Sequence, residues 1–285
     1  MKSIAILYHS NCPDGFGAAW AAWKKFGNKA EYVSIHATQN SGQLEGMRPK
    51  NKKLYFLDVC ASPKDLEKLV RNNKSVIVID HHETSRDKVK YASEALFDIN
   101  HSGSVLAWMY FHPAKKIPKF LRYVEAVDLW RFSSMPHTRE LSTYAYSKPF
   151  DFKIWSSLAR DFENSKKLRR YLELGKALTD YEGDLVDSIA RGAELIKFGK
   201  YKVLAANFSL KKLTSFVGHE LCKRVPPFGI VWYMKNNELN VSLRSDGTID
   251  VSKIAKKFPG GGGHHNSAGF AIPFRGKFPW KVIKK

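Results

Sequence analysis

The sequence predicts an α/β protein with a doubly wound parallel sheet in an N-terminal domain, a helical connector, and a smaller mixed α+β C-terminal domain. In the first half, short runs of β-branched and aromatic residues alternate with helical stretches, which is typical of parallel sheets covered by helices on both faces. A strongly charged helical segment without a glycine- or serine-rich linker follows, and strand signals resume at residue 201. We therefore expect three parts, spanning residues 1–150, 151–196 and 197–285.

Local signals place the elements of the N-terminal domain. Continuous apolar runs predict strands that are buried on both faces. Ser62 followed by Pro63 predicts the start of a helix, because proline suits the first helical turn. Pro113 and Pro118 interrupt the chain before a helix that carries Asp128. The predicted strands span residues 4–8, 32–35, 54–57 and 75–79, and the predicted helices span 15–26, 63–71 and 103–111.

The C-terminal part has a different pattern. Strands are predicted at residues 201–206, 228–234 and 239–243, and residues 235–238 have the composition of a hairpin turn. A short helix over residues 251–258 is expected to lead into a run of glycines. This mixture predicts a smaller α+β domain.

Metal-capable side chains follow three of the predicted N-terminal strands. A single aspartate or histidine at a strand end is usually a turn residue or a core residue. Three instances on one sheet indicate a ligand site, because the carboxyl ends of parallel strands meet at the same edge. Asp128 is a further candidate, although by itself it is equally compatible with an ordinary surface position. The strand-end residues are His9, Cys12, Asp14, Asp58, Asp80, His81 and His82.

The donor set of this candidate site indicates a class of metal. Carboxylates combined with imidazoles and at most one thiol suit Mn²⁺, Mg²⁺ or Fe²⁺ better than a structural zinc. Asp58, on a central strand, could bridge two ions about 3.5–4 Å apart. Two such ions would lower the pKa of a shared water and stabilise charge on a phosphoryl group. That chemistry is phosphoester hydrolysis without a protein nucleophile.

The C-terminal part carries a candidate anion site. The glycine run at residues 260–263 leaves backbone amides able to point at an anion without obstruction, and His264 follows it. A flexible turn with a solvent-exposed histidine is the alternative. Arg244, at the end of a predicted strand, has the planar fork that suits phosphate, but an ordinary surface arginine is equally compatible with the sequence.

These residues resemble the motifs of a known enzyme family. The segment from His9 to Gly15, then Asp58, the Asp80-His81-His82 triplet and Asp128 resemble the four motifs of the DHH phosphoesterases. Residues 260–270 resemble the glycine-rich signature of the family's DHH-associated C-terminal domain. The resemblance spans nearly the whole chain, in the order that the family shows.

The resemblance implies roles for the domains and for individual residues. Residues 1–150 would form the metal-binding catalytic domain and residues 197–285 the substrate-binding domain. His82 would face the substrate phosphate or orient its neighbour, with Asp80 supporting it in catalysis. One metal ion would be held by Asp14, Asp58, His81 and Asp128, and a second by His9, Cys12 and Asp58. Substrate phosphate would be contacted by Arg244, Gly261, Gly262, Gly263 and His264.

The chain departs from the family pattern at Cys12. The usual first loop offers two aspartates separated by one residue, and Cys12 stands where the first is expected. A thiolate is softer and bulkier than a carboxylate. The second ion could therefore bind weakly, differ in kind or be absent, so we expect Mn²⁺, with Mg²⁺ or Fe²⁺ as alternatives, as one or two ions. A small buried residue in a tight loop is the alternative for Cys12 itself.

Composition favours a globular intracellular protein. The 285 residues suffice for two domains, and 44% hydrophobic residues exclude a disordered chain. No apolar run approaches the ~18–20 residues that a membrane span needs, and we expect no signal peptide or membrane association. The three cysteines, an odd and sparse set, predict reduced thiols and a cytoplasmic location.

The charge of the chain favours an anionic substrate. There are 47 lysines and arginines against 27 aspartates and glutamates, for a net charge of +20. Such a surface attracts polyanions and sets affinity and salt dependence rather than sequence preference.

The sequence therefore predicts a metal-dependent phosphodiesterase that hydrolyses short single-stranded oligonucleotides or dinucleotides to nucleoside monophosphates by metal-activated water. Two alternatives are a single-strand-specific exonuclease on longer DNA or RNA, and a nucleic-acid-binding protein in which Cys12 impairs the metal centre. The choice between RNA, DNA and cyclic dinucleotides, the polarity of cleavage and the oligomeric state stay open, with a homodimer among the options.

Overall fold

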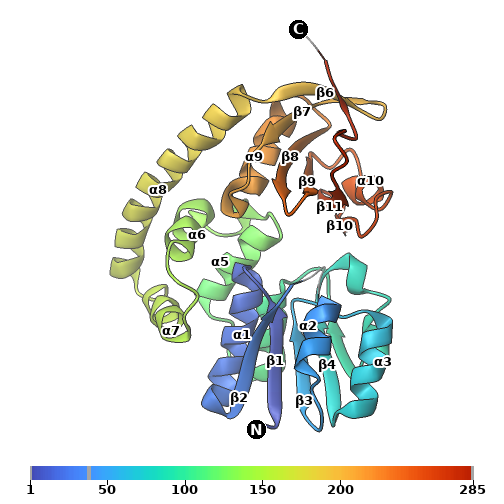
Figure 1. Ribbon diagram of the computed structural model, residues 1–285. Helices are drawn as coiled ribbons and strands as arrows, with labels where there is room; N and C mark the ends of the chain where they lie inside the picture. Colours follow the sequence, from blue (N-terminus) through green and yellow to red (C-terminus); the bar gives the residue numbers. More distant parts are fainter. Residues whose placement is uncertain (1, 37–39, 284–285) are drawn as a thin grey trace. The chain divides into compact units, whose positions relative to one another are not determined.

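The computed structural model describes residues 2–36 and 40–283. The chain divides into two compact units, Met1–Thr179 and Asp180–Lys285, which Figure 1 draws in blue to yellow-green and in yellow to red. Within the described ranges, none of the helices combines the length and apolar character that a membrane span requires.

The first unit is built on a parallel sheet with strand order β2-β1-β3-β4-β5. Each neighbouring pair is parallel, so all the strands present their carboxyl ends at the same edge. The predicted doubly wound fold is confirmed, and β5 is an edge strand that the sequence did not indicate. The strands span Ile4–His9 (β1), Ala30–Ile35 (β2), Lys53–Leu57 (β3), Ser75–Asp80 (β4) and Glu94–Phe97 (β5).

Alternate residues of the central strands pack into two separate cores, one on each face of the sheet. Tyr55 and Ile77 belong to the core that also contains Trp20 and Trp108, whereas Phe56 belongs to the opposite core. This alternation follows from the two-residue period of a strand, and burial on both sides explains why the strands are continuously apolar. Helices α1 (Pro13–Phe26), α4 (Gly103–Phe111), α5 (Lys119–Asp128) and α7 (Phe152–Asp161) contribute to the first core, and α2 (Asn40–Met47) and α3 (Pro63–Asn72) to the second.

Helix starts follow the local signals closely. The Ser62 hydroxyl accepts a hydrogen bond from the Asp65 N–H at 3.2 Å, which satisfies one of the first amides of α3. Helix α1 begins at Pro13, earlier than predicted, with Cys12 at its N-cap. Proline has no N–H to leave unpaired, so it is well suited to begin this helix close to the end of β1.

The predicted connector, residues 151–196, contains α7, α8 (Ser165–Arg191) and the start of β6. Asp151 caps α7, because its carboxylate accepts from the N–H groups of Lys153 and Ile154, both at 2.9 Å. The two compact units meet in sequence within α8, at Thr179. Helix α6 (Thr138–Tyr146), which the sequence pattern missed, precedes this segment.

The second unit contains a seven-stranded mixed sheet with order β10-β11-β9-β8-β7-β6-β12. Strands β7 and β8 are parallel and are connected by α9, whereas the other pairs are antiparallel. Asn236 and Asn237 adopt positive φ in the β8–β9 turn, as a tight hairpin requires. The elements are β6 (Glu194–Phe198), β7 (Tyr201–Asn207), α9 (Lys211–Arg224), β8 (Phe228–Lys235), β9 (Glu238–Ser245), α10 (Val251–Ala255), β10 (Gly262–His264), β11 (Ser267–Pro273) and β12 (Lys281–Val282).

The glycine run differs from the expected open loop. The Gly261 N–H donates to the Phe258 carbonyl at 3.0 Å, and Gly262–His264 form β10, paired with β11. Part of the run therefore satisfies its backbone groups within the fold, and β10 lies at the edge of the sheet.

The ring of Phe270 stacks on that of Phe258 at 3.8 Å between centroids and is buried, so this aromatic belongs to the core.

We expect Gly175→Ala to destabilise the protein by about 1–3 kcal/mol, because a Cβ at Gly175 would lie 2.2 Å from the Glu140 carbonyl oxygen on α6. Gly183, on the same helix, has no atom within 4 Å of the corresponding position and provides a matched control. Gly183→Ala should stabilise the protein by about 0.4–1 kcal/mol through helix propensity and reduced freedom of the unfolded chain. Urea unfolding measures both variants, and equal effects would contradict the packing of α8 on α6.

Candidate metal centre

The carboxyl ends of three adjacent strands deliver the predicted site residues to one place. His9 is the last residue of β1, Asp58 follows β3 directly, and Asp80 is the last residue of β4. Because β1, β3 and β4 are neighbours in the sheet, these ends lie side by side. Asp14 joins them from the first turn of α1, and Asp128 joins them as the last residue of α5.

Three overlapping groups of metal-capable atoms result, and within each group the atoms lie no more than 4.8 Å apart. Asp58 and His81 each belong to two groups, so they connect the whole cluster. The groups are Asp58, Asp80, His81 and His82; His9, Cys12 and Asp58; and Asp14, His81 and Asp128. Every N-terminal residue that the sequence nominated is therefore found in the cluster.

The His81 imidazole lies among carboxylates. Its Nε2 is 3.2 Å from Asp58 Oδ1, 3.4 Å from Asp128 Oδ2 and 3.8 Å from Asp14 Oδ2. Burial by itself would lower the pKa of His81, but the hydrogen bond to Asp58 and the charges of the three carboxylates raise it to about 10. The surrounding carboxylates therefore favour positive charge at the position of the His81 ring.

Asp58 occupies the centre of the cluster. It is 1% exposed, and its Oδ2 lies 3.1 Å from His9 Nδ1. Burial would raise the pKa of Asp58, but His81 and His9 hold it well below its ordinary value. The backbone of Asp58 has a φ of 58°, and its N–H donates to the Ile79 carbonyl at 2.9 Å. A strained backbone that neighbouring structure holds in place is a feature of functional sites.

Asp80 orients His82. Its Oδ1 accepts hydrogen bonds from the N–H groups of His81, at 2.8 Å, and His82, at 3.2 Å, and lies 2.7 Å from His82 Nδ1. This contact fixes the imidazole through Nδ1, so Nε2 points away from Asp80. Burial would lower the pKa of His82, but Asp80 and Asp58 raise it to about 9.

The N-terminus of α4 also contributes to the site, which the sequence did not indicate. The Ser104 N–H donates to Asp14 Oδ1 at 3.0 Å. A Cβ on Gly103 would lie 2.9 Å from Asp58 Oδ1 and 3.0 Å from Asp14 Oδ2, so only glycine lets this helix end approach the carboxylates. Backbone amides at a helix N-terminus stabilise negative charge. The Ser-Gly-Ser sequence indicates that a helix starts here. That this helix end lies against Asp14 depends on the packing of α4 on α1.

The residues fit a divalent cation. Asp14 Oδ2 and Asp58 Oδ1 are buried, and beyond the nearby His81 imidazole no residue in the described ranges donates a hydrogen bond to either oxygen. Buried anionic oxygens that lack donors are costly, and a bound cation would satisfy them. Burial and the charges of Asp128 and Asp58 raise the pKa of Asp14 well above its ordinary value, which reflects the same unmet demand for positive charge.

Cys12 is half-buried and lies at the N-cap of α1. Burial and the nearby carboxylates of Asp58, Asp128 and Asp14 raise the pKa of its thiol well above the ordinary value. Tyr146, on α6, is a residue near the cluster that the sequence did not indicate. Burial and the charges of Asp128 and Asp14 raise the pKa of its phenol.

The second unit places two of the predicted anion-binding residues, Arg244 and His264, in one row of its sheet. Arg244 on β9 pairs with Ser267 on β11, and Ser267 pairs with His264 on β10. Residues paired across antiparallel strands direct their side chains to the same face. Arg244 donates to Ser215 Oγ, at 3.2 Å from Nε and 3.0 Å from Nη2, and burial lowers its pKa to about 10. No carboxylate in the described part of the chain pairs with this guanidinium.

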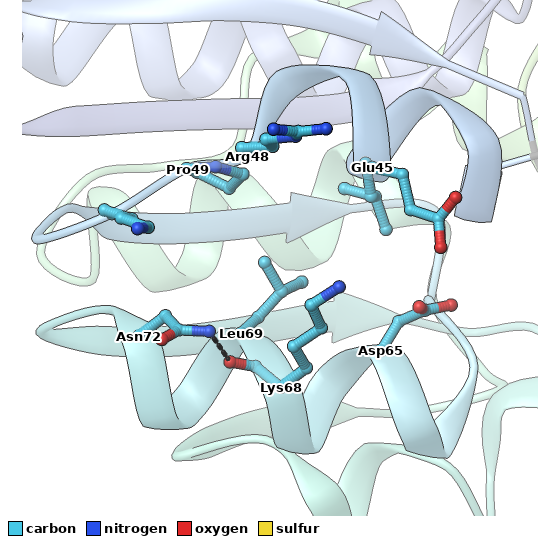
Figure 2. Close-up of a pocket in the computed structure, with 9 residues that line it drawn as sticks. Glu45, Arg48, Pro49, Asp65, Lys68, Leu69 and Asn72 are labelled. Carbon is cyan, nitrogen blue, oxygen red and sulfur yellow. Dashed lines mark hydrogen bonds between the residues drawn. The ribbon is translucent and has the colours of Figure 1, made fainter.

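A separate pocket of about 360 Å³ lies between α2 and α3. Figure 2 shows Glu45 on α2, with Asp65 and Lys68 on α3, directed into the space between these helices. None of the predicted site residues lines this pocket. The cluster at the strand ends therefore remains the candidate for chemistry.

Comparison with known proteins finds two sequence matches. Residues 199–279 match the DHHA1 domain family. An uncharacterized protein, R106 of Acanthamoeba polyphaga mimivirus, is 29% identical over 305 residues, covering 98% of this chain and 70% of that protein.

Solved structures with low sequence identity share the fold. The DHH domain of a protein described as a member of a family of ribosomal proteins aligns with a TM-score of 0.55 at 13% identity, covering 99% of this chain and 83% of that one. An exopolyphosphatase-related protein from Bacteroides fragilis gives 0.53 at 14% identity, covering 97% and 88%. RecJ from Thermus thermophilus in complex with Mn²⁺ gives 0.50 at 13% identity, covering 94% of this chain and 49% of that one.

We expect Asp14→Asn to stabilise the metal-free protein by about 1 kcal/mol, because it removes one of the crowded buried carboxylates while an amide oxygen can still accept from Ser104. The same substitution should reduce the rise in Tm that Mn²⁺ produces in the wild type, since a ligand is lost. Thermal unfolding with and without Mn²⁺ measures both effects. An unchanged Mn²⁺ effect would remove Asp14 from the metal site.

Proposed function

We propose that the chain is a metal-dependent phosphodiesterase of the DHH family, a proposal that the match of residues 199–279 to the DHHA1 domain family supports. Its substrates are short single-stranded oligonucleotides or dinucleotides, which it hydrolyses to nucleoside monophosphates with water activated at the metal centre. The observation that carries this proposal is the position of Asp58, which shares one group of donors with His9 and Cys12 and another with His81.

We assign the residues to two metal positions that would share Asp58. Mn²⁺, with Mg²⁺ or Fe²⁺ as alternatives, would supply a water of lowered pKa and stabilise charge on the phosphoryl group. The burial of Asp14, Asp58 and His81 supports this chemistry, because electrostatic interactions are stronger where water is excluded. The first position would be held by the group Asp14, His81 and Asp128 together with Asp58, whose Oδ1 lies 3.2 Å from His81 Nε2, and the second by His9, Cys12 and Asp58.

His82 is the residue that we assign to the substrate phosphate. Asp80 holds its ring through Nδ1 at 2.7 Å, so the imidazolium form would donate from Nε2 to a phosphate oxygen or to the leaving oxygen. The carboxylate keeps the imidazole charged and correctly oriented, as a fixed partner does for a catalytic histidine. Asp80 thus acts through His82 rather than on the substrate.

The second unit would hold the substrate by its phosphate. A guanidinium without a carboxylate partner among the described residues, in the same sheet row as His264, suits an anion. The outward amides of the edge strand that contains Gly262 and Gly263 would add donors. The net charge of +20 would increase the rate of encounter with nucleic acid.

A length ladder of single-stranded RNA and DNA, incubated with protein and Mn²⁺, tests the proposal. We expect the shortest substrates to be hydrolysed fastest, with nucleoside monophosphates as products. Asp58→Ala is the control: it should abolish turnover while circular dichroism shows an intact fold, because both metal positions lose a ligand. Rates independent of length would favour an exonuclease. Tight, salt-sensitive binding without turnover under any metal would favour a nucleic-acid-binding protein and overturn the enzyme.

We expect Arg244→Ala to raise KM by about 10–100-fold with a smaller effect on kcat, because its loss removes a charge-assisted contact to phosphate but no reacting group. Arg224, whose Nε donates to Glu220 at 2.9 Å, offers a matched control on the same unit, and Arg224→Ala should leave KM unchanged. Steady-state kinetics on a dinucleotide distinguishes the two variants. Equal KM values would remove Arg244 from the substrate site.

A further inference from the structure

We propose that the position formed by His9, Cys12 and Asp58 is a thiolate metal site that prefers Zn²⁺ to Mn²⁺, so that the two positions of the centre bind different metals. The inference rests on the proposed function only in placing metal ions at this cluster. It goes beyond that function in assigning a distinct metal class to each position.

The spacing of the three donors suits a tetrahedral ion. One atom from each residue lies within 4.8 Å of the others, and His9 Nδ1 is 3.1 Å from Asp58 Oδ2. Zn²⁺ bonds of about 2.0–2.3 Å place tetrahedral ligands roughly 3.3–3.8 Å apart, so small side-chain adjustments close the site. Three protein ligands leave one position open for water or substrate, which is the pattern of catalytic zinc.

Asp58 is the donor that this position shares with the rest of the cluster. It is 1% exposed, and beyond the His81 imidazole no described residue donates a hydrogen bond to its Oδ1, while its Oδ2 faces His9. Asp58 therefore directs Oδ2 toward the position of His9 and Oδ1 toward the position of His81. The half-buried Cys12 lies beside it at the N-cap of α1, where the helix dipole favours a thiolate over a thiol once a cation is bound.

Cys12 gives the two positions different donor chemistry. Asp14, His81 and Asp128, together with Asp58, offer mostly oxygen donors, which suit Mn²⁺ or Mg²⁺. Replacement of one oxygen donor by sulfur shifts the other position toward thiophilic ions, and Zn²⁺ also stands above Mn²⁺ in general affinity. On binding, the Cys12 thiol releases its proton to solvent and sulfur becomes the ligand.

Titration of metal-free protein with Co²⁺ tests the inference without any measurement of activity. We expect a thiolate-to-cobalt charge-transfer absorption in the near ultraviolet that Zn²⁺ abolishes by displacement and that a large excess of Mn²⁺ leaves in place. Cys12→Ser should lose this absorption, and Cys12→Asp should lose it and bind two Mn²⁺ ions with similar affinity, as measured by electron paramagnetic resonance. Cys60→Ser and Cys222→Ser are the controls that should retain it, since both cysteines lie outside this donor group.

An absorption that persists in Cys12→Ser, or that the wild type lacks, overturns the inference. Displacement by Mn²⁺ as readily as by Zn²⁺ also overturns it. If Cys12→Ser does not fold, the inference is tested by the Cys12→Asp variant and by the displacement of Co²⁺ from the wild type with Zn²⁺ and with Mn²⁺. A wild type that shows the absorption but hydrolyses no phosphodiester contradicts the proposed function alone. Hydrolysis with two equivalent Mn²⁺ ions and no absorption contradicts this inference alone.

Discussion

The constraint on which the rest of this structure depends is the convergence of buried carboxylates at one edge of a parallel sheet. The buried Asp14 and Asp58, together with the more exposed Asp128, approach a single imidazole, that of His81, within 3.8 Å or less. Charges of one sign cannot be buried together unless opposite charge is present. The imidazole of His81 lies among these carboxylates, and a divalent cation would supply the opposite charge that they need.

The fold provides for this arrangement in several ways. Parallel pairing brings the ends of β1, β3 and β4 together, and burial on both faces of the sheet keeps them rigid. The absence of a side chain at Gly103 lets α4 approach the carboxylates, and its first amides face Asp14. The site is therefore supported by packed secondary structure rather than by mobile loops, which suits the precise positioning of metal ligands.

The second unit collects its candidate residues by strand register. Its sheet brings Arg244, Ser267 and His264 into one row, although they come from separate strands. Part of the glycine run pairs with β11 and forms the edge of the sheet. These glycines therefore serve close backbone packing rather than an open loop.

Local sequence determined most elements of this protein and nearly all the members of the candidate centre. Strand-length apolar runs identified β1, β3 and β4, and the polar residues directly after them identified the site, because parallel strands must end at the same edge. Only the tertiary structure decided that Gly103 and Ser104 contact this centre, that part of the glycine run is a strand, and that Arg244 shares a row with His264. Those relations depend on helix packing and strand register between distant segments, which periodicity along the chain does not encode.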